Sequence, residues 1–102
     1  MRIVSEKTLR QWAAMNRDAE PWLKAWLKAA ERAAWSSLRD VRITYPHADG
    51  VEVKSGRIAT VFNVAGNKYR LITSIHYNRG IVYMLFFLTH AECSRDKWKD
   101  KL

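Results

Sequence analysis

Two stretches of the sequence carry the side chains that can do chemistry. The first runs from residue 62 to 72 and the second from residue 89 to 92. Alternate side chains of a strand point to opposite faces of a sheet. Lys68, Arg70 and His76 therefore share one face of the strand that the first stretch begins. A basic strand face suits a phosphate backbone, and a histidine beside it can transfer protons. This combination favours metal-free RNA cleavage, in which a 2′-hydroxyl attacks the adjacent phosphate.

The second stretch predicts where its histidine lies. Thr89 and Glu92 have the spacing of a capping box, in which the two side chains close the first turn of a helix. His90 then stands at the start of that helix, where free backbone N–H groups and the helix dipole favour anions. We therefore expect His90 to face a phosphate.

The lengths of two loops predict which side chains meet. A two-residue loop at 65–66 pairs Asn63 with Lys68, and a three-residue loop at 78–80 pairs Lys68 with His90. We therefore predict one row of Asn63, Lys68 and His90 across three strands. A slip of one residue in any strand turns its side chains to the other face.

Each of these residues has a chemical and a structural interpretation. The two cations either neutralise a phosphate or only solubilise the surface, and His90 is either an acid or base or a histidine without a task. His90 and Cys93 have a metal-like spacing without a second ligand pair, so we predict neither a metal nor a cofactor. The predicted catalytic residues are Arg70, His90 and Lys68, and the predicted substrate-binding residues are Asn63, Asn67 and His76.

The composition bounds the class of protein. A length of 102 residues predicts a single domain over residues 1–102, and 48% hydrophobic residues exclude a disordered chain. The formal charge of +8 favours an acidic partner, which is nucleic acid, an anionic membrane surface or an acidic protein. The single Cys93 fits a reducing compartment. The first residues lack an apolar signal segment and the run 81–88 is too short to span a bilayer, so we expect a cytoplasmic protein.

The order of the patterns predicts an α+β fold. Residues 2–4 are β-like, and Ser5 and Asp18 are placed to cap two helices. Residues 36–50 are typical of a connection, weakly extended over 40–43. Strands are predicted at 51–56, 57–64, 68–77 and 81–88, and a short C-terminal helix at 91–98. We expect two N-terminal helices on one face of an antiparallel sheet of three or four strands, with the other face partly open.

Four segments together resemble a known family. They are Ala33-Ala34-Trp35 before Asp40-Val41, Tyr45-Pro46-His47-Ala48-Asp49, residues 61–72, and Thr89-His90-Ala91-Glu92. In these segments the chain resembles the HigB-type toxins of bacterial type II toxin–antitoxin systems, within the wider RelE-like group of mRNA interferases. The resemblance covers nearly the whole chain.

The resemblance implies a compact RelE-like fold and metal-free cleavage of mRNA on the translating ribosome, which inhibits translation. It also implies a HigA-like helix-turn-helix antitoxin as partner. Carried over by position, it implies active-site roles for Arg70 and His90, supported by Lys68. Relatives usually have Tyr-Asp where this chain has Cys93-Ser94, and many have arginine in place of Leu85. A non-catalytic RNA- or ribosome-binding module and a structural partner of an acidic protein are the alternatives.

Overall fold

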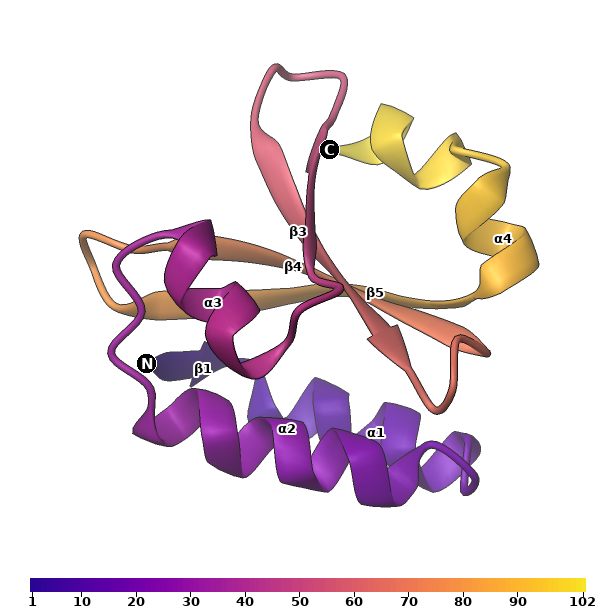
Figure 1. Cartoon of the computed structure of the whole chain (residues 1–102). Helices are drawn as coiled ribbons and strands as arrows, with labels where there is room; N and C mark the ends of the chain where they lie inside the picture. The colour runs from indigo at the N-terminus through magenta and orange to yellow at the C-terminus, as the bar shows by residue number, and fades with distance from the viewer.

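The computed structural model describes residues 1–102 as an α+β fold, as predicted (Figure 1). The helices pack on a five-stranded sheet, and a short helical segment ends the chain. The elements in chain order are β1 (Arg2–Val4), α1 (Glu6–Met15), α2 (Glu20–Arg32), α3 (Leu38–Thr44), β2 (Asp49–Glu52), β3 (Ile58–Val64), β4 (Tyr69–His76), β5 (Ile81–Thr89), α4 (His90–Ser94) and the 3-10 helix η1 (Lys97–Lys101).

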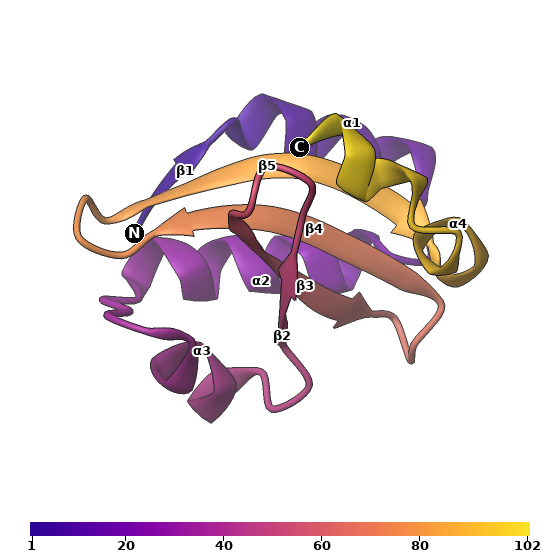
Figure 2. The same cartoon turned by 90° about the horizontal axis from the view of Figure 1, so that it is seen from above.

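The sheet is mixed and has one strand more than predicted. Its order is β1-β5-β4-β3-β2, with β1 parallel to β5 and every other pair antiparallel. The extra strand is β1, which pairs along the outer edge of β5 (Figures 1 and 2). β5 is therefore an interior strand, which explains why its sequence is apolar on both faces.

Helices α1 and α2 lie side by side against one face of the sheet (Figures 1 and 2). Helix α2 buries Leu23, Trp26, Leu27 and Ala30, which recur at helical spacing. Trp26 meets Phe62 of β3 edge to face, with ring centroids 5.5 Å apart. This apolar layer holds the strands that carry the site in a fixed orientation.

The two predicted helix caps have different outcomes. The hydroxyl of Ser5 accepts a hydrogen bond from the backbone N–H of Thr8, so the predicted cap of α1 is confirmed. The prediction that Asp18 caps α2 is wrong, because the cap residue is Ala19 and no side chain bonds to the helix start. The carboxylate of Asp18 accepts hydrogen bonds from Tyr69 and Lys68 of the β3–β4 hairpin instead.

Two further elements differ from the sequence predictions. Residues 38–44 form helix α3 rather than an extended connection, and the carboxylate of Asp40 closes its start by accepting from the N–H of Ser36 at 2.9 Å. These hydrogen bonds also lower the pKa of Asp40 below its usual value. The single helix predicted over 91–98 is two short helices, because Asp96 adopts a left-handed conformation, with φ of 61°, between them.

The second face of the sheet is only partly covered, by the C-terminal segment. Trp98 of η1 is buried there, and its indole N–H donates to the carbonyl of Cys93 at 3.1 Å. Its neighbours are the buried side chains Val53, Ala59, Val61 and Ile72. This small cluster leaves a hollow open at each end of the face, and the two hollows are described below.

Candidate active site

The β3–β4 hairpin brings Asn63 beside Arg70 rather than beside Lys68. The predicted two-residue loop is wrong, because the observed turn has four residues, Ala65 to Lys68, and Asn63 pairs with Arg70. Ala65, Gly66 and Asn67 all have positive φ, and three such residues in succession widen the turn. The error in register is two residues, so every side chain still points to the predicted face.

The β4–β5 hairpin contains two deviations that offset one another. Its turn has four residues rather than three, so His76 pairs with Ile81. A bulge opposite Ile72 and Thr73 then shifts the register by one residue, and Tyr69 pairs with Thr89. The backbone N–H of His90 donates to the carbonyl of Lys68 at 3.1 Å. The predicted adjacency of these two residues is confirmed at the backbone.

The capping box at the start of α4 is confirmed. The Thr89 hydroxyl accepts from the N–H of Glu92 at 3.2 Å, and the Glu92 carboxylate accepts from the N–H of Thr89 at 3.0 Å. The hydrogen bond from the Thr89 backbone lowers the pKa of the Glu92 carboxyl below its usual value. These reciprocal bonds hold His90, the first residue of the helix, at the end of β5.

Arg70 and His90 are in direct contact. An Nη atom of Arg70 lies 2.7 Å from His90 Nδ1, and the other Nη donates to the carbonyls of Asn67 and Tyr69 at 3.1 and 3.0 Å. A guanidinium group has donors only, so Nδ1 is the acceptor in this contact. The contact is thus a hydrogen bond in the tautomer that has its ring proton on Nε2. The hairpin turn thus holds the arginine and the arginine orients the histidine.

The side chain of Lys68 turns away from this pair. Its ammonium group donates to the Asp18 carboxylate and lies 5.4 Å from the centre of the Tyr69 ring. The Tyr69 hydroxyl also donates to Asp18, at 3.0 Å. The hydrogen bond between the two charged groups lowers the pKa of Asp18 and raises that of Lys68. The catalytic role of Lys68 stays a prediction, and its observed contacts join the hairpin turn to the segment between α1 and α2.

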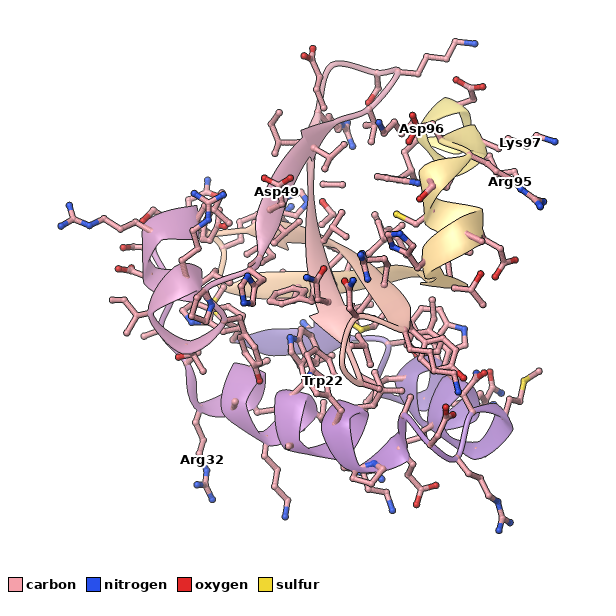
Figure 3. All side chains as sticks on the ribbon, turned by 45° about the vertical axis from the view of Figure 1, so that its right-hand side comes forward. Trp22, Arg32, Asp49, Arg95, Asp96 and Lys97 are labelled. Atoms are coloured by element: carbon pink, nitrogen blue, oxygen red, sulfur yellow. The ribbon has the colours of Figure 1, made fainter.

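Arg70 and His90 line a hollow of about 490 Å³ between the β2–β3 side of the sheet and the C-terminal segment. Such a volume lies within the range of small-ligand pockets, roughly 300–1,000 Å³. Asn63, predicted to bind substrate, lines the same hollow, while Asn67 bonds to Arg70 through its carbonyl. Asp49 of β2 and Asp96 before η1 lie on its two sides (Figure 3).

Three basic residues of this hollow were not predicted from the sequence as site residues, namely Arg42, His47 and Lys99. Arg42 donates to the Ala48 carbonyl at 2.8 Å and lies 3.4 Å from an Asp49 oxygen. The ammonium of Lys99 lies 3.1 Å from an Asp96 oxygen. Arg42 and Lys99 reach the hollow only because segments far apart in the sequence pack together in the fold, which local sequence patterns do not predict. His47 belongs to a segment that carries the family resemblance, which was the one signal available.

His76 is not brought to this hollow. It lies at the other end of β4, where its ring meets Tyr83 edge to face at 5.1 Å and Nε2 lies 3.4 Å from the Ser74 hydroxyl. It lines a second hollow on the same face of the sheet, together with Leu85 of the bulge. Its role in substrate binding stays a prediction.

A family comparison gives this geometry a context. The model of the HigB toxins, described as the RelE-like toxic component of a toxin–antitoxin system, matches residues 19–95. The chain belongs to this family. As a toxin of such a system it has an antitoxin as its partner. A search of curated proteins found no match. The matched range contains Arg70, His90 and every segment that lines the site except the last few residues.

Cys93, for which the family resemblance predicts a tyrosine, lines the hollow one helical turn after His90. Burial raises the pKa of its thiol above the usual value, so the group stays protonated near neutral pH. Cysteine has no aromatic ring, so Cys93 cannot stack on a base as a tyrosine can. No three His, Cys, Asp or Glu side chains come together as a metal-holding group, and no helix has the length and apolar character needed to cross a membrane.

Proposed function

We propose that this toxin is an endoribonuclease that cleaves mRNA on the translating ribosome and thereby stops translation. The observation that carries the proposal is the contact of Arg70 with His90 Nδ1 in a hollow that is also lined by the ion pairs Arg42–Asp49 and Lys99–Asp96. A cation that binds phosphate and an imidazole that accepts a proton are the two groups that 2′-hydroxyl attack needs first. The reaction takes place in the cytoplasm, where translating ribosomes are found.

The same contact suggests how binding starts the reaction. A phosphate that enters the hollow competes for the Nη donors of Arg70, since charge-assisted bonds to phosphate are strong. His90 Nδ1 then loses its donor and can accept the proton of the 2′-hydroxyl as O2′ attacks phosphorus. Asn63, paired with Arg70 on β3, can donate to the phosphate or to a base. These steps use side chains alone.

The test is induced expression in a bacterial host. We expect arrested translation and mRNA cut within translated regions, and we expect a HigA-like helix-turn-helix antitoxin encoded beside the toxin to reverse both. Arrest with intact mRNA would overturn the nuclease and favour the second candidate, a non-catalytic ribosome-binding module. The observation that favours this candidate is Cys93, which stands where the family resemblance predicts a tyrosine.

A further inference from the structure

The proposed reaction needs a second proton transfer, and this inference rests on that reaction. When O2′ attacks phosphorus, the bond from phosphorus to O5′ must break, and O5′ leaves more easily with a proton. His90 takes the first proton, so it is not the donor of the second in the same step. A second titratable group must therefore face the phosphate.

Most of the charged and titratable groups that line the hollow are already engaged. From α3 and β2, Arg42 and Asp49 bind one another. From the C-terminal segment, Lys99 and Asp96 bind one another. The thiol of Cys93 on α4 is too weak an acid for this task, because burial raises its pKa. These pairs neutralise one another and offer no proton donor suited to neutral pH.

His47 is the remaining titratable side chain of the hollow besides the Arg70–His90 pair. It is exposed, and its ring makes no hydrogen bond to another residue of the chain. An imidazole ring can donate an N–H to a leaving oxygen, and the His47 ring has no competing partner in the chain. Its chemistry therefore matches the role that the reaction leaves open.

His47 reaches the hollow from the side of β4 opposite to His90. It precedes β2, which pairs with β3, and β3 pairs with β4 through Asn63 and Arg70. His47 stands in the turn just before β2, and it lines the same hollow as Asn63 and Arg70. His90 approaches Arg70 from the opposite direction, across β5. An in-line displacement needs its base and its acid on opposite sides of phosphorus.

We propose that His47 is the general acid of this toxin. As O2′ bonds to phosphorus, His90 takes the proton of the 2′-hydroxyl and protonated His47 gives a proton to O5′. The bond between phosphorus and O5′ breaks with its electron pair on O5′. The products are a 2′,3′-cyclic phosphate and a free 5′-hydroxyl, with one proton taken up and one released by the protein.

The test compares two RNA substrates with toxin on programmed ribosomes. One has the natural O5′ at the cleaved bond, and the other has sulfur in its place, which leaves without a proton. We expect H47Q to slow the oxygen substrate by about 10²- to 10⁴-fold, the usual worth of general acid catalysis, and to cleave the sulfur substrate at nearly the wild-type rate. The alkaline limb of the pH–rate profile should disappear in H47Q, since that limb reports the group that must be protonated.

Matched controls separate this proposal from its alternatives. R57A changes a basic residue at the other hollow, away from His47, and should keep the alkaline limb. Equal losses on the two substrates in H47Q would show that His47 binds or supports the fold, and would overturn its role as acid. An unchanged rate in H47Q would overturn it as well. A wild-type toxin that cleaves neither substrate would refute the proposed nuclease itself, which is a separate result.

Discussion

The two ends of strand β4 differ in chemistry although they share a sheet face. Each end opens onto a hollow of about 490 Å³, and each hollow has a histidine and an arginine in its lining. At one end Arg70 touches His90 at 2.7 Å among further cations. At the other end His76 packs on Tyr83 in a largely apolar hollow, with Arg57 at its rim. Size therefore does not distinguish the two hollows, whereas the convergence of charged groups does.

The cause of the difference is the path of the chain. Beyond the Arg70 end, β5 continues into α4, and the capping box fixes the histidine next to the hairpin turn. Beyond the His76 end, β4 returns to β5 through a four-residue turn, and β1 pairs with the start of β5. Ile72 and Trp98 fill the space between the two ends. The start of α4 thus lies beside the end of β4, and this places His90 in contact with Arg70.

The largest effect is expected from R70A. This change removes the charge on the phosphate and the group that orients His90, so the cleavage rate should fall by roughly 10³- to 10⁵-fold, as for arginines that stabilise charge in phosphoryl transfer. The measurement is single-turnover cleavage on programmed ribosomes. The matched control is R57A, at the other hollow, which should cleave nearly as the wild type does.

Thermal unfolding separates chemistry from folding in the same variant. R70A should unfold within about 1 kcal/mol of the wild type, because surface changes cost little. W26A, which truncates a fully buried side chain, should lose about 3–5 kcal/mol. If R70A were as unstable as W26A, Arg70 would be a structural residue and the comparison of the two ends would fail.

A smaller loss is expected from H90Q. Removing the base should slow cleavage by about 10²- to 10⁴-fold while the cations still bind the ribosome. The acidic limb of the pH–rate profile should disappear, since it reports the group that must be unprotonated. H76Q should keep the rate at saturating substrate and change at most the affinity. A normal rate in H90Q would remove His90 from the mechanism.

The contacts of Lys68 predict a modest and non-additive effect. If Lys68 acts through Asp18 by holding the hairpin turn, D18N and K68M should each slow cleavage by about fivefold or less, as expected for an exposed ion pair. The double variant should be no slower than either single variant. A K68M loss much larger than that of D18N would show that Lys68 contacts the phosphate itself, as the sequence analysis predicts.

Acid should destabilise helix α4 before helix α2. The pKa of Glu92 in the folded state lies below its ordinary value of 4.5, so the ionised carboxylate stabilises α4. This contribution is complete above the ordinary value and is lost as pH falls through the lowered one. The protection of α4 amides from hydrogen exchange, taken relative to their intrinsic exchange rate at each pH, should therefore be lost at a higher pH than the protection of α2 amides. E92Q should remove this pH dependence, and an unchanged profile in E92Q would contradict it.

The elements of the fold were predictable where local signals agree. The cap at Ser5, the capping box around His90 and the apolar β5 each depend on neighbouring residues. The helix at 38–44 was missed because it depends on one carboxylate bonding to Ser36 and on the burial of Val41. Propensity alone does not report such contacts.

The site was predictable only in part, since it depends on register. The predicted pairing of Lys68 with His90 is correct because a longer turn and a bulge offset one another. No local sequence pattern predicts the bulge at Leu85. The predicted pairing of Asn63 with Lys68 is wrong because residue types alone do not predict positive φ at three successive turn residues. His47 was missed since its segment reaches the hollow only through the sheet.

The central claim is that the Arg70 end of β4, and not the His76 end, receives the reacting phosphate. The most direct measurement is an NMR titration of the histidine rings and arginine side chains with a dinucleotide that has one phosphate and a 2′-deoxyribose before it, which prevents cleavage. We predict that the resonances of His90 and Arg70 shift with the dinucleotide while those of His76 and Arg57 stay in place. Shifts at His76 and Arg57 with none at His90 would contradict the account.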